Sequence, residues 1–494
     1  MVNKRKMIDY HGNDGSLGKD ENSIKILTYN ILAAHVPTTT NWDERKSKLL
    51  EELKDYKADV MCLQEVVDTD VTEFFGPQLL VHGYEYIMNT ERNDMYFGPG
   101  NNFKMGCAIF YKSSSFRVNK NSPYGPYKIN FRRAARQFLR DHNLENPENA
   151  IRYLKDKAGI GCMLEFRPQK KKIMIFIVTV HLTANEELSD VKLLQTYLLL
   201  KGLSIIEKEK IPIIVAGDFN IIPKSEPYMM ITNRQMPKPA EVKKASTDET
   251  APKDETAATD KTVVTDETVA TDKTAPKDGT VATNKAVPTV EKPGIDLGLF
   301  LNVPPMAASL ESAYSTVFKP GSHKGLKECR RMNPKTMEPI FTTASNAVEY
   351  FKNTIDYIFY TKEEFSVEGI LEPIDDVEVL PTEDWPSDHI ALMANMQLKK
   401  KRKMVVEQAK FLRQPVADIW NKRDENSPCS SKDTNDQEPE TSANKEAAAD
   451  QECETSSRKE SVYEEYETST SKDAADQECE TSSSKEHNAS MEED

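Results

Sequence analysis

The side chains best suited to chemistry lie where apolar segments end. Residues 211–223, IPIIVAGDFNIIP, predict a buried strand that leads into Asp218 and Asn220. Residues i and i+2 of an extended chain point to the same side, so this carboxylate and this amide should project together from the end of a core strand. The alternative is an ordinary turn closed by Asx residues.

Five more apolar segments carry polar side chains at their margins. They are residues 24–30 ending in Asn30, residues 59–65 ending in Glu65, residues 172–181 ending in His181, residues 354–360 containing Asp356, and residues 385–396 led by Asp388 and His389. One strand-end histidine is usually structural, but so many margins with oxygen ligands and imidazoles are hard to assign to turns alone. Rigid strands would hold these groups in place for catalysis.

The residue types favour metal-assisted cleavage of a phosphodiester. Mg²⁺ prefers oxygen ligands and is normally held by one or two carboxylates plus substrate phosphate. Glu65 is the best ligand candidate, with Asn30 beside it through its amide oxygen. A phosphodiester repels hydroxide, so its hydrolysis needs a cation, an activated water and a stabilised leaving oxygen. His389 is the candidate general base or proton shuttle, and Asp356 would orient its ring.

The polar motifs, taken in chain order, resemble a known superfamily. YN, LQEV, the strand-end histidine, GDFN, IDY and SDH look like the endonuclease/exonuclease/phosphatase superfamily. Residues 29–32, 106–112 (GCAIFYK), 189–195 (SDVKLLQ) and 354–360 are similar to the carbon-catabolite-repressor-type deadenylases and the related angel, nocturnin and 2′-phosphodiesterase branch. The resemblance covers roughly residues 22–398. It implies an α/β fold, a four-layer sandwich of two packed mixed β-sheets flanked by helices.

The resemblance also implies a role for each motif residue. Asn30 and Glu65 correspond to the metal side of the family's site, and Asp388 supports that side. Asp218 would align or activate the water, while Asn220 and His181 would donate to the phosphoryl oxygens. The cofactor implied is Mg²⁺, with Mn²⁺ as an alternative ion.

Two positions bear on the choice of substrate. Deadenylases of this branch stack adenine on a phenylalanine five residues before the IDY aspartate, and Phe351 occupies that position here. Phe351 has an alternative interpretation as a core aromatic residue near the start of an apolar strand. The same enzymes carry Trp-Asp-Pro just after the strand-end histidine, whereas this chain has Glu186 in the place of that proline. The departure puts selectivity for poly(A) in doubt.

Three functions remain open from the sequence. The favoured one is a Mg²⁺-dependent 3′-to-5′ exoribonuclease of the deadenylase type, which acts on single-stranded 3′ ends of mRNA poly(A) tails and releases 5′-nucleotides. The second is an angel-like or 2′-phosphodiesterase-like enzyme acting on RNA 2′,3′-cyclic phosphates, 2′,5′-oligoadenylate or another phosphate ester. The third, a catalytically silent scaffold, is disfavoured because every catalytic position holds the expected residue type. No leucine-rich-repeat module for recruitment to the deadenylase complex is expected.

Composition divides the 494 residues into a catalytic body and low-complexity segments. We expect a flexible N-terminus over residues 1–21, a catalytic domain over residues 22–398 and a basic linker over residues 399–423. A Thr/Asp/Lys/Ala repeat over residues 238–292 interrupts the domain and should be disordered. The repetitive tail, residues 424–494, should also be disordered; it holds 22 acidic and 6 basic residues, so it accounts for the net charge of −15. That charge therefore does not exclude a nucleic-acid substrate for the body.

Hydrophobic periodicity predicts alternating elements in the body. Strands are expected at residues 24–30, 59–65, 84–88, 106–111, 115–120, 160–166, 173–181, before GDFN, at 355–360 and 366–371, and in the segment led by Asp388. Helices are expected at residues 42–57, 128–158 and 187–207.

Cysteine usage and the absence of targeting patterns suggest a cytoplasmic protein. The seven cysteines form no CxxC pair, which favours a reducing compartment. We expect no secretory signal peptide, because the N-terminus lacks an apolar region, and no membrane contact, because no apolar run reaches the length of a membrane span. KKKRK at residues 399–403 is either a solvated chain end or a nuclear-import cluster, so a nuclear location stays open.

Overall fold

The computed structural model describes a large part of the chain. The described residues are 5–9, 22–35, 41–92, 104–118, 126–142, 154, 158–167, 173–233, 306, 309–318, 331–346, 350–399 and 421–422. The chain divides into two compact units, Met1–Asn426 and Ser427–Asp494, and every described residue belongs to the first. The repeat at residues 238–292, the tail at 424–494 and the KKKRK cluster beyond residue 399 lie outside the described residues.

Most described strands belong to two sheets. The first has the spatial order β1 (Met7–Asp9), β15 (Phe365–Leu371), β16 (Leu392–Leu398), β2 (Ser23–Asn30), β3 (Val60–Val67), β5 (Lys104–Lys112) and β4 (Tyr84–Arg92). The second has the order β11 (Leu310–Ser312), β14 (Asp356–Thr361), β10 (Ile213–Asp218), β9 (Met174–His181), β8 (Ala158–Phe166), β7 (Tyr127–Asn130) and β17 (Asn421–Lys422), with β6 (Phe116–Val118) also paired to β8. A separate hairpin pairs β12 (Thr343–Ser345) with β13 (Phe351–Asn353).

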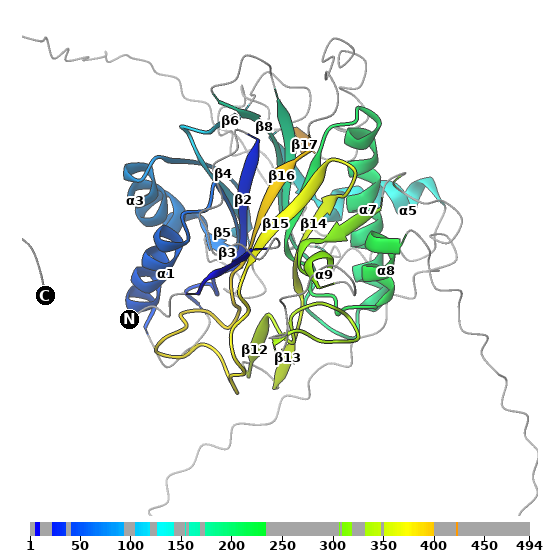
Figure 1. Cartoon of the computed structure of the whole chain (residues 1–494). Helices are drawn as coiled ribbons and strands as arrows, with labels where there is room; N and C mark the ends of the chain where they lie inside the picture. Colours follow the sequence, from blue (N-terminus) through cyan, green and yellow to red (C-terminus); the bar gives the residue numbers. More distant parts are fainter. Residues whose placement is uncertain are drawn as a thin grey trace, which may run out of the picture. The chain divides into compact units, whose positions relative to one another are not determined.

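Helices cover the outer face of each sheet, so the body has four layers (Figure 1). The first sheet packs against α1 (Trp42–Tyr56) and against the continuous segment of α2 (Asp68–Asp70), the π-helix η1 (Val71–Phe75) and α3 (Gly76–Val81). The second packs against α5 (Phe131–Asp141), α7 (Ser189–Lys208) and α8 (Glu226–Asn233), while the short α9 (Ala313–Val317) follows β11. The predicted four-layer α/β sandwich is confirmed.

An apolar core holds the two sheets face to face. Ile26, Val60 and Cys62 of the first sheet share one buried cluster with Ile177 and Ile214 of the second. All eight residues of β9, MIFIVTVH, are buried, which explains why its sequence is nearly continuously apolar rather than alternating. This contact fixes the distance between the sheets, and with it the distance between the polar residues at their ends.

Each sheet contains one parallel strand pair joined by a helix. In the first, β2 leads through α1 to β3; in the second, β9 leads through α7 to β10. The carboxyl ends of parallel strands meet at the same edge of a sheet, which is where open α/β sheets bind ligands. The β2–α1–β3 segment therefore brings Asn30 and Glu65 to one edge, and the β9–α7–β10 segment brings His181 and Asp218 to the facing edge.

Some boundaries differ from those expected. The strand expected over residues 385–396 begins only at Leu392, because Pro386 cannot donate to a ladder and the His389 N–H is taken by Ser387 Oγ. Glu65 lies within β3 rather than at its end. The helix expected over residues 128–158 is the shorter α5, while residues 143–153 lie outside the described part of the chain.

Both expected flexible or linker regions contribute a short strand. Within residues 1–21, Met7–Asp9 pair antiparallel with β15, and Ile8 packs against the core between the sheets. Within residues 399–423, Asn421–Lys422 pair with β7. Backbone pairing to an open sheet edge, which no local pattern signals, overrides the polar composition in both places.

A buried arginine anchors the loops around the site edge of the first sheet. Arg45, on α1, is 1% exposed. Its Nη1 donates to the carbonyl oxygens of Ile31 at 3.3 Å and Pro386 at 2.9 Å, and its Nη2 donates to those of Leu32 at 2.9 Å and Ala33 at 3.3 Å. One guanidinium therefore fixes the turn that follows Asn30 and the loop that precedes Asp388.

Replacing Arg45 with methionine should destabilise the fold. The change removes four hydrogen bonds to a charged donor and leaves buried carbonyls without partners, so the free energy of unfolding should fall by roughly 3 kcal/mol. Urea denaturation measures this loss. Lys48→Met is the matched control, because Lys48 lies on the same helix and its ammonium donates to the Glu383 carbonyl in an exposed hydrogen bond; the change should alter stability by less than about 0.5 kcal/mol. Equal effects in the two variants would contradict the anchoring role of Arg45.

Candidate active site

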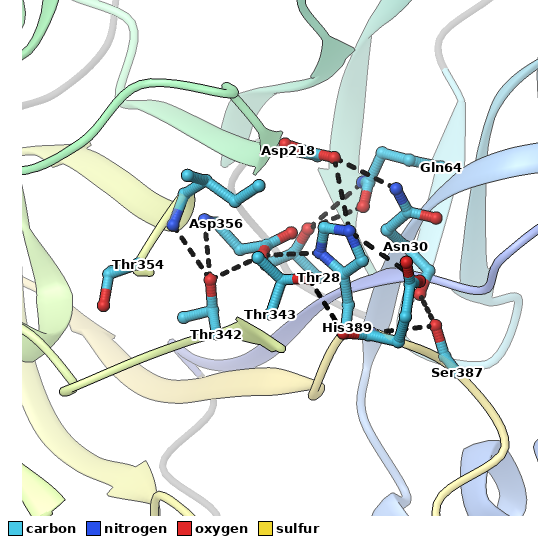
Figure 2. A network of polar contacts seen from close by, with 12 residues as sticks. Thr28, Asn30, Gln64, Asp218, Thr342, Thr343, Thr354, Asp356, Ser387 and His389 are labelled. Atoms are coloured by element: carbon cyan, nitrogen blue, oxygen red, sulfur yellow. Dashed lines mark hydrogen bonds and ion pairs between the residues drawn. The ribbon is translucent and has the colours of Figure 1, made fainter. Parts of the chain in front are cut away.

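The polar strand margins of the two sheets converge in one place. Figure 2 shows the His389 ring between Asp356 on one side and Asp218 and Asn30 on the other. Asp218 pairs in register with His181 on the parallel strand β9 and with Asp356 on the antiparallel strand β14. Sheet register in the second sheet therefore places these three side chains side by side.

A backbone irregularity directs Glu65 into the site. The β3–β5 register shifts between Gln64 and Val66, and Glu65 has a φ of 55°, in the left-handed region. A bulge of this kind turns one side chain out of the strand's alternation. The Glu65 carboxylate then accepts hydrogen bonds from Asn30 Nδ2 at 3.0 Å and from the Ala33 N–H at 3.2 Å.

Asn30 presents its nitrogen to the site, not its oxygen. Nδ2 donates both to Glu65 Oε1 and to Asp218 Oδ2, each at 3.0 Å, while Oδ1 accepts from the Leu32 N–H at 3.1 Å. The network fixes this orientation, since carboxylates need donors and the Leu32 N–H needs an acceptor. We expected the amide oxygen beside the metal; in this structure Asn30 instead joins one carboxylate of each sheet.

His389 is oriented by a buried carboxylate and a threonine. Its Nδ1 lies 2.8 Å from Asp356 Oδ2, and Thr342 Oγ1 donates to the same oxygen at 2.6 Å. Because Asp356 accepts, Nδ1 carries the hydrogen and Nε2 is turned to the opposite side. Nε2 lies 3.8 Å from Asp218 Oδ2 and 4.0 Å from Asp388 Oδ1. This arrangement allows Nε2 to take or give a proton at the centre of the site.

Asp218 Oδ2 is the point on which the site converges. Besides Asn30 and His389, the Nε2 atom of His181 lies 3.5 Å from it. Asp218 Oδ1 accepts the Asn220 N–H at 3.0 Å, which holds Asn220 at a φ of 50°. The Asn220 side chain donates to the Leu182 carbonyl at 3.0 Å. Asp218 and Asn220 thus belong to one turn beside His181, as their spacing suggested.

The buried carboxylates have opposite tendencies to ionise. Burial and the neighbouring Asp356 charge raise the pKa of Asp218 to about 7. Burial also raises the pKa of Glu65, but His181, the Asn30 amide and the Ala33 N–H outweigh it and lower that pKa to about 2. Burial lowers the pKa of His389, whereas Asp356 and Asp388 raise it, and the result lies well above the ordinary value. The edge of the first sheet therefore carries a fixed negative charge.

The donor set fits a divalent cation that prefers oxygen ligands. Asp356 Oδ1 and Asp388 Oδ1 are buried and accept no hydrogen bond from the described residues. Asp388 lies close enough to Glu65 for their charges to interact, and burial raises its pKa. Ligand atoms of Asp218, Asp356 and His389 lie within 4.8 Å of one another. Glu65 and Asp388 could hold such a cation without disturbing the hydrogen bond between His389 Nδ1 and Asp356 Oδ2.

Three further residues support the site and were not expected from the sequence. Thr342 fixes Asp356, and Ser387 Oγ donates to the Asn30 carbonyl at 2.7 Å. Gln64 Nε2 donates to Thr179 Oγ1 at 2.8 Å, from β3 across to β9 of the other sheet. Gln64 precedes Glu65, and Ser387 precedes Asp388, so their adjacency to the motif residues was the one sequence feature that could have predicted them. No such feature marks Thr342.

Phe351 and Glu186 lie on separate segments. Phe351 begins β13 and is partly exposed, with Ser345 opposite it on β12. Glu186 is exposed on the loop between β9 and α7. Partial exposure is what a stacking platform requires, and it disagrees with the alternative of a fully buried core aromatic.

The sequence that carries these residues matches a known family. A model of the Endonuclease/Exonuclease/phosphatase family matches residues 27–389. The chain belongs to the Endonuclease/Exonuclease/phosphatase family. The resemblance stated from the motifs is thereby confirmed, and the matched span runs from β2 to His389.

Several relatives within the family can be compared with this chain. Carbon catabolite repressor protein 4 homolog 1 of Arabidopsis thaliana is 29% identical over 427 residues, which cover 80% of this chain and 62% of that protein. The CCR4-Not complex 3'-5'-exoribonuclease subunit Ccr4 of Saccharomyces cerevisiae is 27% identical over 229 residues, 42% of this chain and 26% of that protein. This chain thus spans less than two thirds of the length of these curated relatives.

A solved structure shares the fold. The crystal structure of ANGEL2, a 2',3'-cyclic phosphatase, in complex with adenosine-2',3'-vanadate aligns with a TM-score of 0.50 and 21% identity. The alignment covers 81% of this chain and 99% of that chain. Among the residues that the structure describes here, no helix is long and apolar enough to cross a membrane.

The metal-free protein should lose stability as pH rises from about 5 to 8. Asp218 and His389 both have raised pKa values in the folded state, so the folded protein binds more protons than the unfolded chain across this range. Each pKa unit corresponds to about 1.4 kcal/mol. Urea denaturation in EDTA at several pH values measures the slope.

Asp218→Ala and added Mg²⁺ provide the controls for this slope. Removing the Asp218 carboxyl should flatten it between about pH 5 and 7. Saturating Mg²⁺ should also flatten the slope of stability against pH, because the cation neutralises the carboxylate charge that bound protons neutralise in the metal-free protein. An unchanged slope in Asp218→Ala would show that this carboxyl is not the titrating group.

Proposed function

We propose that the protein is a Mg²⁺-dependent 3′-to-5′ exoribonuclease of the deadenylase type. In this proposal it hydrolyses phosphodiester bonds at single-stranded 3′ ends of RNA, including poly(A), and releases 5′-nucleotides. The convergence of His389, His181 and Asn30 on Asp218 supports this function most directly, because it sets a proton carrier and two hydrogen-bond donors around one point. The exoribonuclease activity in the name of the yeast relative agrees with it.

Each site residue has a distinct task in this proposal. Glu65 and Asp388 hold the cation, which when bound would neutralise charge on the phosphate and its leaving oxygen. Asn30 keeps Glu65 and Asp218 at a fixed separation. Asp218 orients the attacking water, and His181 and Asn220 donate to the phosphoryl oxygens.

His389 moves the proton that the reaction must transfer. Its Nδ1–H is held by Asp356, and the paired carboxylate stabilises the imidazolium form, in which Nε2 also carries a proton. Thr342 keeps the accepting oxygen of Asp356 in place.

A cyclic-phosphate or 2′,5′-oligoadenylate activity is the second candidate. The loop after His181 carries an exposed acidic residue, Glu186, in a segment that should face the nucleotide bases. A carboxylate there repels the phosphodiester backbone. Glu186 also stands where the deadenylases have a proline, so the contact that this proline makes with a base is missing. We therefore expect only modest preference for adenine.

The charge of Glu65 should be essential for turnover. Glu65→Gln keeps the shape of the side chain but removes its negative charge, so hydrolysis of oligo(A) at saturating Mg²⁺ should fall by at least about 100-fold with little loss of stability. Glu51→Gln, an exposed change on α1, is the matched control and should leave turnover unchanged. Activity is followed by release of 5′-AMP, beside 2′,3′-cyclic-phosphate and 2′,5′-linked substrates. Wild-type hydrolysis of the cyclic phosphate alone would replace the first candidate with the second.

Phe351 should contribute to binding of the terminal base. Base stacking on an aromatic ring is worth about 1–3 kcal/mol, so Phe351→Ala should weaken RNA binding roughly 5- to 100-fold. Its melting temperature should change little, since truncating a fully buried phenylalanine would instead cost about 3–5 kcal/mol. Phe351→Tyr should retain binding. A large drop in the melting temperature of Phe351→Ala would contradict the platform role.

Turnover of the wild type on oligo(A), oligo(U) and oligo(C) tests the interpretation of Glu186. Strict oligo(A) selectivity would contradict it.

A further inference from the structure

A buried lysine on α7 contacts both loops that border the second sheet's half of the site. Lys192 lies in the first turn of α7 and is 7% exposed. Its Nζ donates to the Asn220 carbonyl at 2.7 Å and to the Ala184 carbonyl at 3.4 Å. Ala184 follows β9 and Asn220 follows β10, so one ammonium group joins the ends of two parallel strands.

The hydration that a buried ammonium group loses must be replaced by hydrogen bonds. The Lys192 ammonium makes them to backbone carbonyls. A charged group removed from water loses several kcal/mol of hydration unless hydrogen bonds replace it. Charge-assisted bonds to carbonyl oxygens are stronger than neutral ones and fix their acceptors in place. Asn220, whose carbonyl accepts from Lys192, has a left-handed φ of 50° and donates its N–H to Asp218 Oδ1.

The same helix contacts the post-β9 segment at a second point. Gln195 lies three residues after Lys192, on the same side of α7, and its Oε1 accepts the Thr183 N–H at 3.0 Å. The Leu182 carbonyl in that segment accepts from Asn220 Nδ2 at 3.0 Å. Residues 182–184 and Asn220 are therefore linked to each other and to one rigid helix.

The first sheet uses an equivalent device. Arg45 of α1 binds the carbonyls that follow β2, as Lys192 of α7 binds those that follow β9 and β10. Each crossover helix thus carries a buried cationic side chain that binds carbonyls at strand ends: Arg45 those after β2, and Lys192 those after β9 and β10. The Lys192 ammonium binds the carbonyl of Asn220 and that of Ala184, three residues after His181. His181 and Asn220 are the two residues proposed to bind the phosphoryl oxygens.

We propose that Lys192 is a positioning residue for the reaction, which holds Asn220 and the segment after His181 in the geometry that receives the phosphoryl group. This inference rests on the proposed function of the same site. Lys192 acts through the Asn220 and Ala184 carbonyls and does not touch the reacting atoms. Small displacements of such donors reduce the chemical step more than binding, because the donors are aimed at the transition state.

Lys192→Met, Lys192→Arg and Lys201→Met test this role. Methionine keeps the apolar stem and removes the ammonium, whereas arginine keeps the charge and the donors. Lys201 lies on the same helix, near the Phe138 ring and away from the site, and is the matched control. The measurements are kcat and KM on oligo(A) with Mg²⁺, and hydrogen exchange of peptides covering residues 182–184 and 219–221 in the full-length, metal-free protein.

The expected result has three parts. Lys192→Met lowers kcat by at least about 30-fold with KM within about threefold, and both peptides exchange at least about tenfold faster while β9 and β10 keep their protection. Lys192→Arg recovers a large part of kcat, and Lys201→Met matches the wild type. Unchanged exchange in both peptides, unchanged kcat, or exchange that accelerates throughout the second sheet would each overturn the proposal. If the wild type cleaves no RNA, the proposed function fails, while the exchange comparison still decides whether Lys192 holds the two segments.

Discussion

The whole site depends on placing several carboxylates close together out of water. Asp218 and Asp356 are opposite each other on neighbouring strands, and both are about 1% exposed. Like charges in this position repel, and burial together with the Asp356 charge raises the pKa of Asp218. Neighbouring polar groups compensate this charge. Asn30 and His389 lie beside Asp218, and Thr342 and His389 lie beside Asp356. The apolar packing between the sheets must supply the stability that this arrangement costs.

The two crossover units explain how such a site stays rigid although loops form it. Each parallel strand pair ends at the site. Arg45 of α1 binds the backbone that follows β2, and Lys192 of α7 binds the backbone that follows β9 and β10. Gln64 adds a hydrogen bond between β3 and β9, from one sheet to the other, directly behind the site. The loops are thereby held by helices and strands that the apolar clusters already fix, so chemistry does not depend on loop packing alone.

In the proposed function, catalysis and substrate choice depend on separate parts of the protein. The groups proposed to act on a phosphate come from strand ends and their supports, whereas Phe351 and Glu186 come from a hairpin and a surface loop outside the two sheets. A change in the hairpin or the loop could therefore alter the preferred RNA end without moving the polar groups at the strand ends.

The sequence by itself determined the layers, most strands and the set of polar residues at their ends. Those features follow from local periodicity. The six polar margins lie at or near strand ends in the structure, because periodicity defines strand ends to within a few residues. The tertiary structure decided what each group contacts. The left-handed bulge at Glu65, the rotation of the Asn30 amide and the start of β16 after His389 all depend on partners distant in the chain. Arg45 contacts a carbonyl 341 residues away, and Thr342, just before β12, fixes Asp356 of β14. Hydrogen bonds over such separations leave no periodic pattern, so only the packing of the two sheets could reveal Arg45, Thr342 and Lys192 as parts of the site.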